Sequence, residues 1–277
     1  MDMPETADKK INGGPSGNGR GMGSVLLGYL KSARVGVSIK GLTKSFGDNH
    51  VLRGIDLEIS PGETVVILGK SGTGKSVMLR HIIGLEKPGG GTILIGGEDI
   101  NDPDFKKNHV VSMVFQSSAL FNSLSVEENV ALYLKEHSVF DPVKIKQLVS
   151  SALEIVGLEG KESEMPSVLS GGMKRRVAAA RSLVMNPDLI LFDEPTSGLD
   201  PMMTRTIGDL ICDLKHKIEI TQIVVTHDID LAFYVADRLA ILSEGRIIEY
   251  GTPDDIRSCK NYAVQEFITP QFEQARR

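Results

Sequence analysis

The chain has 277 residues, of which 41% are hydrophobic, and its formal net charge at pH 7 is −5. This length allows a large buried core without a disulfide framework, and the two cysteines, Cys212 and Cys259, have neither metal-ligand nor redox spacing. The negative charge argues against a nucleic-acid partner, which requires a basic face, and no run approaches the roughly 18 consecutive apolar residues of a membrane-spanning helix.

Residues 1–36 are predicted to form a mobile N-terminal tail. They mix acidic and basic side chains, unlike the basic start and apolar block of a secretory signal, and this predicts a cytoplasmic protein. Residues 11–24 are rich in glycine and polar residues, which bury too little apolar surface to offset the entropy of ordering. The apolar residues within 25–30 are expected to dock on the core; a membrane anchor is the weaker alternative.

From Val37 onward the pattern changes to short alternating runs. Apolar and polar residues alternate over 37–40 and 55–59, a further apolar pair lies at 51–52, and residues 47–49 have the composition of a turn. A period of two is typical of β-strands that bury one face. The sequence therefore predicts half-buried strands in this region.

Residues 69–76 read Gly-Lys-Ser-Gly-Thr-Gly-Lys-Ser, directly after the apolar run 65–68 and before a helix expected from Val77. Glycines let the backbone curl so that successive N–H groups point at one anion, and the N-terminus of the next helix adds partial positive charge. In such a loop Lys75 reaches the β- and γ-phosphates of a nucleotide and the Ser76 hydroxyl ligates Mg²⁺. The flanking strand and helix argue against a chance match.

A helical insertion is predicted over about 117–166. Asp141 followed by Pro142 indicates a capped helix start, and Gly157 indicates its end. The apolar residues expected on its buried face are Val143, Ile145, Leu148, Val149 and Val156.

Two solid apolar runs, 189–192 and 223–225, have the form of central parallel strands covered on both faces. The first ends in Asp193 and Glu194, at the edge of a sheet where ligands bind open α/β folds. Asp193 suits indirect Mg²⁺ coordination, and Glu194 suits polarisation of the water that attacks the γ-phosphate. Ordinary solvated carboxylates are the alternative. Runs 239–242 and 247–249, joined by Ser-Glu-Gly-Arg, predict a hairpin.

Leu169-Ser170-Gly171-Gly172-Met173 precedes a strong helix-forming stretch that ends near Asn186-Pro187. Ser170 is expected to cap this helix, and the glycines leave its first N–H groups bare. Two interpretations stay open. The segment is either a well-capped helix and nothing more, or a second anion-binding helix start that covers a nucleotide held by another copy of the chain.

The order of these motifs resembles the ATPase subunit of an ABC transporter. Gln116 after an apolar strand, Leu-Ser-Gly-Gly, Asp-Glu-Pro-Thr-Ser-Gly-Leu-Asp at 193–200 and Thr-His-Asp at 226–228 occur in the family's order over about 37–253. The resemblance implies an α/β fold: a P-loop NTPase (RecA-like) core with an antiparallel β subdomain and an inserted helical subdomain. It also implies ATP and Mg²⁺ as cofactors, and head-to-tail homodimers that work with a separate integral membrane permease.

The resemblance also assigns roles position by position. Phe46 is expected to stack on adenine, Asp200 to link the two sites of the dimer, and Glu194, His227 and Gln116 to form the catalytic set. Mg²⁺ is expected at Ser76, Gln116 and Asp193. The nucleotide contacts are expected from Gly69, Lys70, Ser71, Gly72, Thr73, Gly74, Lys75, Ser76 and Val77, and across the dimer from Ser170, Gly171 and Gly172. Two departures are a phenylalanine at position 46 in place of tyrosine, which keeps stacking, and Met173 in place of glutamine.

A narrower similarity is to the Mla/Mce-associated ATPases, which power phospholipid or other hydrophobic-substrate transport between bacterial membranes. It rests on the segments 115–121, 128–131, 134–137 and 165–168 and on Met173. It implies a lipid-binding Mce-type component and a location on the inner face of the cell membrane, with Phe121 and Leu124 as permease contacts or as core residues.

The alternatives are an ATPase for a polar-solute importer, a soluble ABC ATPase acting on ribosomes or DNA, and a regulatory nucleotide-binding module. Residues 254–277 are expected to form a C-terminal tail without an assigned role.

Overall fold

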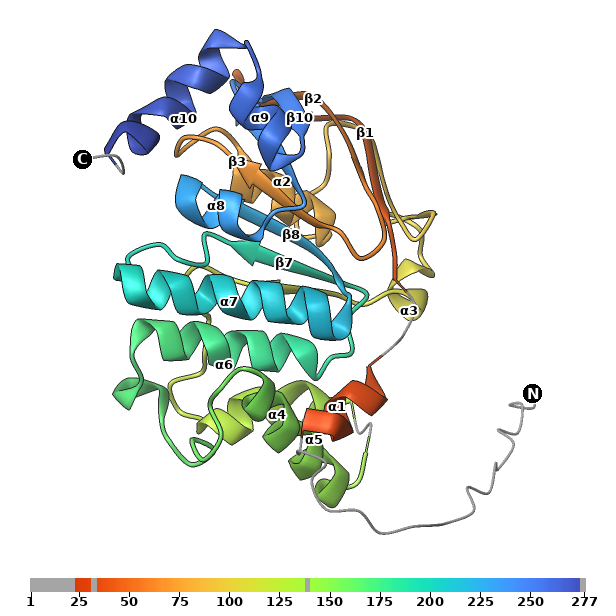
Figure 1. Ribbon diagram of the computed structural model, residues 1–277. Coiled ribbons are helices and arrows are strands. Elements are labelled where there is room, and N and C mark those ends of the chain that lie inside the picture. Colours follow the sequence, from red (N-terminus) through yellow and green to blue (C-terminus); the bar gives the residue numbers. More distant parts are fainter. Residues whose placement is uncertain (1–22, 31–33, 138–139, 275–277) are drawn as a thin grey trace.

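The computed structural model describes residues 23–30, 34–137 and 140–274, which contain two sheets with helices packed around them (Figure 1). The larger sheet has the strand order β10-β9-β3-β8-β7-β6. Its strands in chain order are β3 (Thr64–Leu68), β6 (Val111–Val114), β7 (Leu189–Asp193), β8 (Thr221–Thr226), β9 (Arg238–Ser243) and β10 (Arg246–Gly251). They run parallel except β10, which forms the predicted hairpin with β9.

The central strands of this sheet are buried on both faces, as their solid apolar composition predicts. In β3, Val66 and Leu68 belong to one hydrophobic cluster, whereas Val65 and Ile67 belong to another on the opposite face. Because side chains alternate along a strand, the one sheet separates two cores.

The smaller sheet is antiparallel, with strand order β2-β1-β4-β5. Its strands are β1 (Val37–Phe46), β2 (Asn49–Ile59), β4 (Gly90–Ile95) and β5 (Glu98–Asp99), so the strands predicted within 37–59 are confirmed. Ile39 and Ile55 share a core with Met78 and Leu79 of helix α2 (Lys75–Ile82) and with the second face of the large sheet. A short helix, α3 (Phe105–Asn108), follows this sheet.

The helical insertion contains α4 (Val126–Glu136), α5 (Pro142–Ile155) and a 3₁₀ turn (Pro166–Val168), followed by α6 (Gly171–Leu183). Asp141 caps α5 as predicted, with Oδ1 accepting from the N–H groups of Val143 and Lys144. Val143 itself is 68% exposed, so its assignment to the buried face was wrong. It lies two residues before Ile145, which places it about 200° around the helix from the buried stripe.

Part of the region expected to be a mobile tail forms helix α1 (Gly23–Tyr29), while residues 1–22 and 31–33 lie outside the described residues. Leu26 is fully buried, and its N–H donates to Ser151 Oγ of α5 at 3.0 Å. The ring of Tyr29 meets that of Phe140 edge-on, with centroids 5.5 Å apart. The apolar segment is therefore docked on the helical insertion, beside α4 and α5 (Figure 1).

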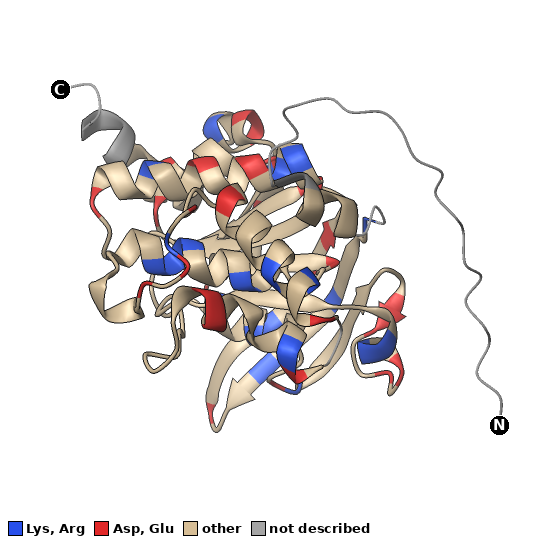
Figure 2. Ribbon diagram, turned by 90° about the horizontal axis from the view of Figure 1, so that it is seen from below, with Lys and Arg blue, Asp and Glu red and all other residues tan. Residues whose placement is uncertain are grey.

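The remaining helices are α7 (Pro201–Ile218), α8 (Ile229–Val235), α9 (Pro253–Ser258) and α10 (Tyr262–Gln274). Helices α9 and α10 occupy the expected C-terminal tail. Their residues Ile256, Val264 and Ile268 belong to the same hydrophobic core as Val66 and Leu68 of β3. No described helix has the length and apolarity needed to span a membrane. Basic and acidic residues are interspersed along the helices seen from below (Figure 2).

Candidate nucleotide site

The loop between β3 and α2 is shaped by close backbone approaches. A Cβ on Gly69 would lie 2.5 Å from the Leu242 carbonyl oxygen of β9, and Gly74 has a φ of 103° at the N-cap of α2. Neither position accepts a larger residue without strain. The Thr73 hydroxyl donates to the Lys70 carbonyl at 2.9 Å and closes the loop. Helix α2 begins at Lys75, two residues before the predicted start.

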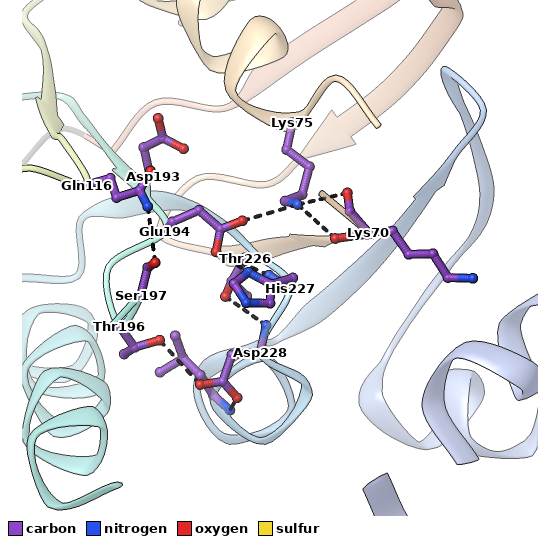
Figure 3. Close-up of polar contacts among 12 residues, drawn as sticks. Lys70, Lys75, Gln116, Asp193, Glu194, Thr196, Ser197, Thr226, His227 and Asp228 are labelled. Carbon is purple, nitrogen blue, oxygen red and sulfur yellow. Dashed lines mark hydrogen bonds and ion pairs between the residues drawn. The ribbon is translucent and has the colours of Figure 1, made fainter. Parts of the chain in front are cut away.

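Lys75 lies at the centre of the site, with its side chain 5% exposed (Figure 3). Its Nζ donates to the carbonyl oxygens of Gly69 at 2.7 Å and Lys70 at 3.2 Å, and it forms an ion pair with Glu194 Oε1 at 3.1 Å. All three donor positions of the ammonium are therefore used. Lys75 also lines the cavity at this loop, where the sequence predicts the phosphates.

Glu194 follows β7 directly and has a positive φ of 46°. Its N–H donates to the Val225 carbonyl at 2.9 Å, which fixes the end of β7 to β8. Its Oε2 lies 2.8 Å from His227 Nδ1 and accepts from the His227 backbone N–H at 3.3 Å. Since a carboxylate can only accept, the proton lies on Nδ1 of His227 in this contact.

The expected metal ligands also meet. Ser76 Oγ donates to Asp193 Oδ1 at 2.8 Å, so a hydroxyl and a carboxylate from α2 and β7 lie side by side. Burial raises the pKa of Asp193, and the hydrogen bond from Ser76 and the charge of Lys75 offset part of this effect. Hard oxygen ligands at the edge of a phosphate loop fit Mg²⁺, which binds through one or two protein oxygens, substrate phosphates and water. Among the described residues, no group of three or more histidine, cysteine, aspartate or glutamate side chains is arranged to hold a metal ion by itself.

Lys75, Ser76, Glu194 and His227 line a cavity of about 440 Å³. Gln116, after β6, donates through Nε2 to Ser197 Oγ at 3.1 Å and faces the cavity (Figure 3). Phe46 lies at another wall, 47% exposed, with the Lys44 ammonium 5.1 Å from its ring centroid. The lining residues are Phe46, Val51, Ser71, Gly72, Gly74, Lys75, Ser76, Val77, Gln116, Glu194, Ser197 and His227.

Not every predicted residue lines this cavity. Gly69, Lys70, Thr73 and Asp193 are absent from its lining, although they belong to the phosphate loop and to the end of β7. Ser170, Gly171, Gly172 and Asp200 are also absent from it and lie at the starts of α6 and α7. Ser170 caps α6, with Oγ accepting from the Met173 N–H at 3.2 Å, which confirms the predicted cap. Asp200 caps α7 in the same way, with Oδ1 accepting from the Met203 N–H at 2.9 Å. The pair Asp200-Pro201 carries the same signal as Asp141-Pro142 and could have predicted this helix start.

Sequence reasoning missed several residues of the site. Ser197 and Val51 line the cavity, and Ser197 could have been found from its place in the motif at 193–200. The Thr196 hydroxyl donates to Asp228 Oδ2 at 3.3 Å, which joins the segments that follow β7 and β8. Arg175 of α6 contacts the Gln116 and Ser197 carbonyls, and nothing in the sequence distinguished it from the basic residues on either side.

A glycine-rich strand-to-helix loop, a buried lysine and an acidic pair at the end of β7, a strand of the same parallel sheet, define a P-loop nucleoside triphosphatase. The family description "ABC transporter" matches residues 52–197. The chain is 39% identical over 238 residues to the probable ribonucleotide transport ATP-binding protein Mkl of Mycobacterium leprae, covering 84% of this chain and 69% of Mkl. It is 43% identical over 220 residues to the Fe(3+) ions import ATP-binding protein FbpC of Photobacterium profundum, covering 79% and 62%.

Similar solved structures point to the same family. CbiO1 of Clostridium perfringens, part of the transporter complex CbiONQ, has a TM-score of 0.75 and 32% identity, covering 86% of this chain and 97% of that one. The cassette MJ0796, solved as a dimer with ADP and phosphate, has a TM-score of 0.70 and 33% identity, covering 78% and 98%. The chain belongs to the ABC transporter family as an ATP-binding subunit, and the predicted fold class is confirmed. Cassettes of this family bind ATP with Mg²⁺ and hydrolyse it.

The raised pKa of Asp193 predicts how Mg²⁺ dependence changes with pH. A carboxylate must be deprotonated to hold a metal, so acidification should weaken Mg²⁺ binding at a higher pH than it would at an ordinary aspartate. Below that pKa, the Mg²⁺ concentration for half-maximal ATPase activity should rise by about tenfold per pH unit. The measurement is a series of Mg²⁺ titrations from neutral to acid pH. Asp193→Asn should need more Mg²⁺ at every pH and lose this dependence; an unchanged pH dependence in that variant would contradict the assignment.

Proposed function

We propose that this chain hydrolyses ATP at the site around Lys75 and Glu194, and thereby powers phospholipid transport between bacterial membranes through a permease on a separate chain. The observation that carries the catalytic part is the contact of one carboxylate, Glu194, with both the loop lysine and His227. These three groups come from three segments of the chain and converge at one edge of the sheet. Their chemistry matches in-line attack of water on a γ-phosphate.

Each residue has a role that its position supports. Glu194 polarises the attacking water, and His227 orients that carboxylate and contacts the γ-phosphate. Lys75 neutralises charge on the β- and γ-phosphates, while Ser76 and Asp193 hold Mg²⁺ or its water ligands. Bound Mg²⁺ supplies charge neutralisation at the phosphates. Gln116 faces the same cavity with its amide, between these groups and Ser197.

The position of Ser170 supports a site shared between two copies. It is the exposed N-cap of α6 and does not line the cavity of its own chain, although it resembles a γ-phosphate contact. We assign it, with Gly172 and Asp200, to the site of a partner copy in a head-to-tail homodimer. The related cassette MJ0796 was solved as a dimer, which supports the association of two copies.

An apolar cavity of about 480 Å³ between α4, α6 and β6 supports a permease partner. Its apolar lining includes Met113, Phe115, Phe121, Tyr133 and Met185, and Phe121 is 52% exposed. The buried amide of Asn129 holds the Phe121 backbone through its N–H at 2.9 Å and its carbonyl at 3.0 Å. Such a groove fits an amphipathic helix. In this arrangement the chain lies peripherally on the inner face of the cell membrane.

The substrate assignment rests on the segments that resemble the Mla/Mce-associated ATPases, with an Mce-type lipid-binding component as a further partner. A polar-solute importer is the second candidate, because the relatives Mkl and FbpC carry names for ribonucleotide transport and Fe(3+) import. The two candidates share the same nucleotide chemistry and differ only in the membrane subunits.

Glu194→Gln should retain ATP binding and lose turnover by about 10²- to 10⁴-fold, because the amide cannot take a proton from water. Nucleotide binding and steady-state phosphate release measure the two effects. Glu244→Gln is the matched control, since Glu244 also has a positive φ, at 47°, and is exposed in the β9–β10 turn. Normal hydrolysis by the Glu194 variant would remove this residue as the base.

Mixing Lys75→Ala chains with Ser170→Arg chains should restore one working site per mixed dimer. The intact loop of one chain then faces the intact Ser170 of the other. Isolated heterodimers carrying two different tags should hydrolyse ATP at up to about half the wild-type rate, because one of two sites is complete. A double-variant chain paired with wild type has the same two lesions but no complete site, and it should stay inactive. Equal activity of the two heterodimers would contradict the shared site.

The substrate is tested on the native complex purified with its permease. Mass spectrometry should identify a bound phospholipid, and complexes reconstituted in phospholipid vesicles should move labelled phospholipid only with ATP. Complexes with Glu194→Gln should not. Co-purification of a solute-binding protein, with ATP-dependent uptake of a polar solute and no lipid movement, would favour the second candidate instead.

A further inference from the structure

Arg175 is a buried arginine in the second turn of α6, and it contacts two loops of the site. Only 8% of this residue is exposed to solvent. Its Nη2 donates to the carbonyl oxygen of Ser197, after β7, and to that of Gln116, after β6, at 3.5 Å. The side chains of these two residues are joined directly as well, since Gln116 Nε2 donates to Ser197 Oγ. One guanidinium therefore joins two segments that each face the nucleotide cavity.

The charge of Arg175 has no carboxylate partner among the ion pairs of the described chain, and its Nε is buried without a hydrogen bond. Burial lowers its pKa, yet an arginine side chain keeps its proton in proteins. Burying a charge whose only partners are carbonyl groups is costly, and packing alone would be served as well by an apolar side chain. An apolar side chain could fill this space but could not donate to either carbonyl, so the hydrogen bonds are what the arginine adds here.

The Gln116 segment depends on such bonds. A second cavity of about 480 Å³, lined by Phe115, Gln116, Ser117, Arg175, Asp193 and Ser197, leaves it without continuous packing on this side. Farther along, Arg181 of α6 donates to the carbonyls of Ser118 at 3.0 Å and Ala119 at 2.8 Å. Both of those residues have positive φ, of 63° and 46°, which costs energy unless neighbouring contacts hold them.

We propose that Arg175 is a positioning residue for ATP hydrolysis: it fixes the backbone of Gln116 against that of Ser197, so that the Gln116 amide stays at the Mg²⁺ and water site. The same helix begins with Ser170. Arg175 therefore also connects the end of α6 assigned to the partner copy with Gln116 in its own chain. This inference rests on the proposed role of Gln116.

The test is the variant Arg175→Met in the full chain. Methionine keeps much of the length and the apolar stem of the arginine side chain and removes its hydrogen-bond donors. A shift of about 1 Å in a positioned group can cost about 10²-fold in rate, so we expect kcat to fall by about 10- to 100-fold. The KM for ATP should change less than about threefold, because the phosphate loop and Phe46 are untouched. The Mg²⁺ concentration for half-maximal activity should rise.

Arg176→Met is the matched control. Arg176 is the next residue of α6, its Nε is also buried without a partner, and it also donates to two carbonyls, those of Val156 at 3.2 Å and Gly157 at 3.0 Å. Those acceptors lie at the end of α5, away from the nucleotide cavity. Arg176→Met should lower the thermal stability of the protein. It should leave unchanged both the Mg²⁺ requirement and the rate of hydrolysis per bound nucleotide.

A double-mutant cycle with Gln116→Ala decides the mechanism. If Arg175 acts through Gln116, the two kcat losses should be strongly non-additive, whereas Arg176→Met should combine additively with Gln116→Ala. Arg175→Lys keeps one donor group and should recover part of the lost kcat. If Arg175→Met does not fold, the same kcat, Mg²⁺ and additivity measurements are made on Arg175→Lys. Unchanged kcat and Mg²⁺ requirement, or full additivity with Gln116→Ala, would overturn the proposal. A Gln116→Ala chain with normal activity would instead refute the role of Gln116 itself.

Discussion

The ion pair between Lys75 and Glu194 is the contact on which the site depends. Their side chains are 5% and 11% exposed, so each charge would be costly to bury without the other. Lys75 is further held by the two loop carbonyls, and Glu194 by His227. A buried pair with these additional hydrogen bonds fixes the distance between the phosphate loop and Glu194, the residue that we propose as the base. The rest of the architecture serves to bring these two residues together.

Strand register places the pair. β8 lies between β3 and β7 in the parallel sheet, so the carboxyl ends of all three strands come to one edge. The loop after β3 carries Lys75, the end of β7 carries Asp193 and Glu194, and the end of β8 leads into His227. A shift of one residue in any of these strands would turn its side chains to the other face and misplace its contribution to the site. The two cores on opposite faces of the sheet, both made by alternating residues of these strands, therefore set the register and the site together.

Helix α6 connects this edge with surfaces that we assign to other chains. It is capped by Ser170 and holds the segment around Gln116 through Arg175 and Arg181, and the cavity beside Phe121 lies between α4 and α6. The nucleotide cavity, the partner-facing helix start and the apolar groove thus share one helix. A rigid helix with contacts at both ends is one kind of element that carries coupling between two distant sites.

The sequence alone determined the phosphate loop, the buried parallel strands, the acidic pair after β7 and the caps at Asp141 and Ser170, because each depends on local chemistry or on periodicity within one element. The motif order determined the family. Only the tertiary structure decided which distant residues meet: Ser197 against Gln116, Arg175 against both, and α1 against α5. These contacts join residues far apart in the chain, and a carbonyl acceptor leaves no trace in the sequence, since every residue carries one. Val143 was assigned to the wrong face because its angle from Ile145 around the helix was not taken into account. Residues 25–30 were expected to dock on the core, but only the packing showed that they dock on α5.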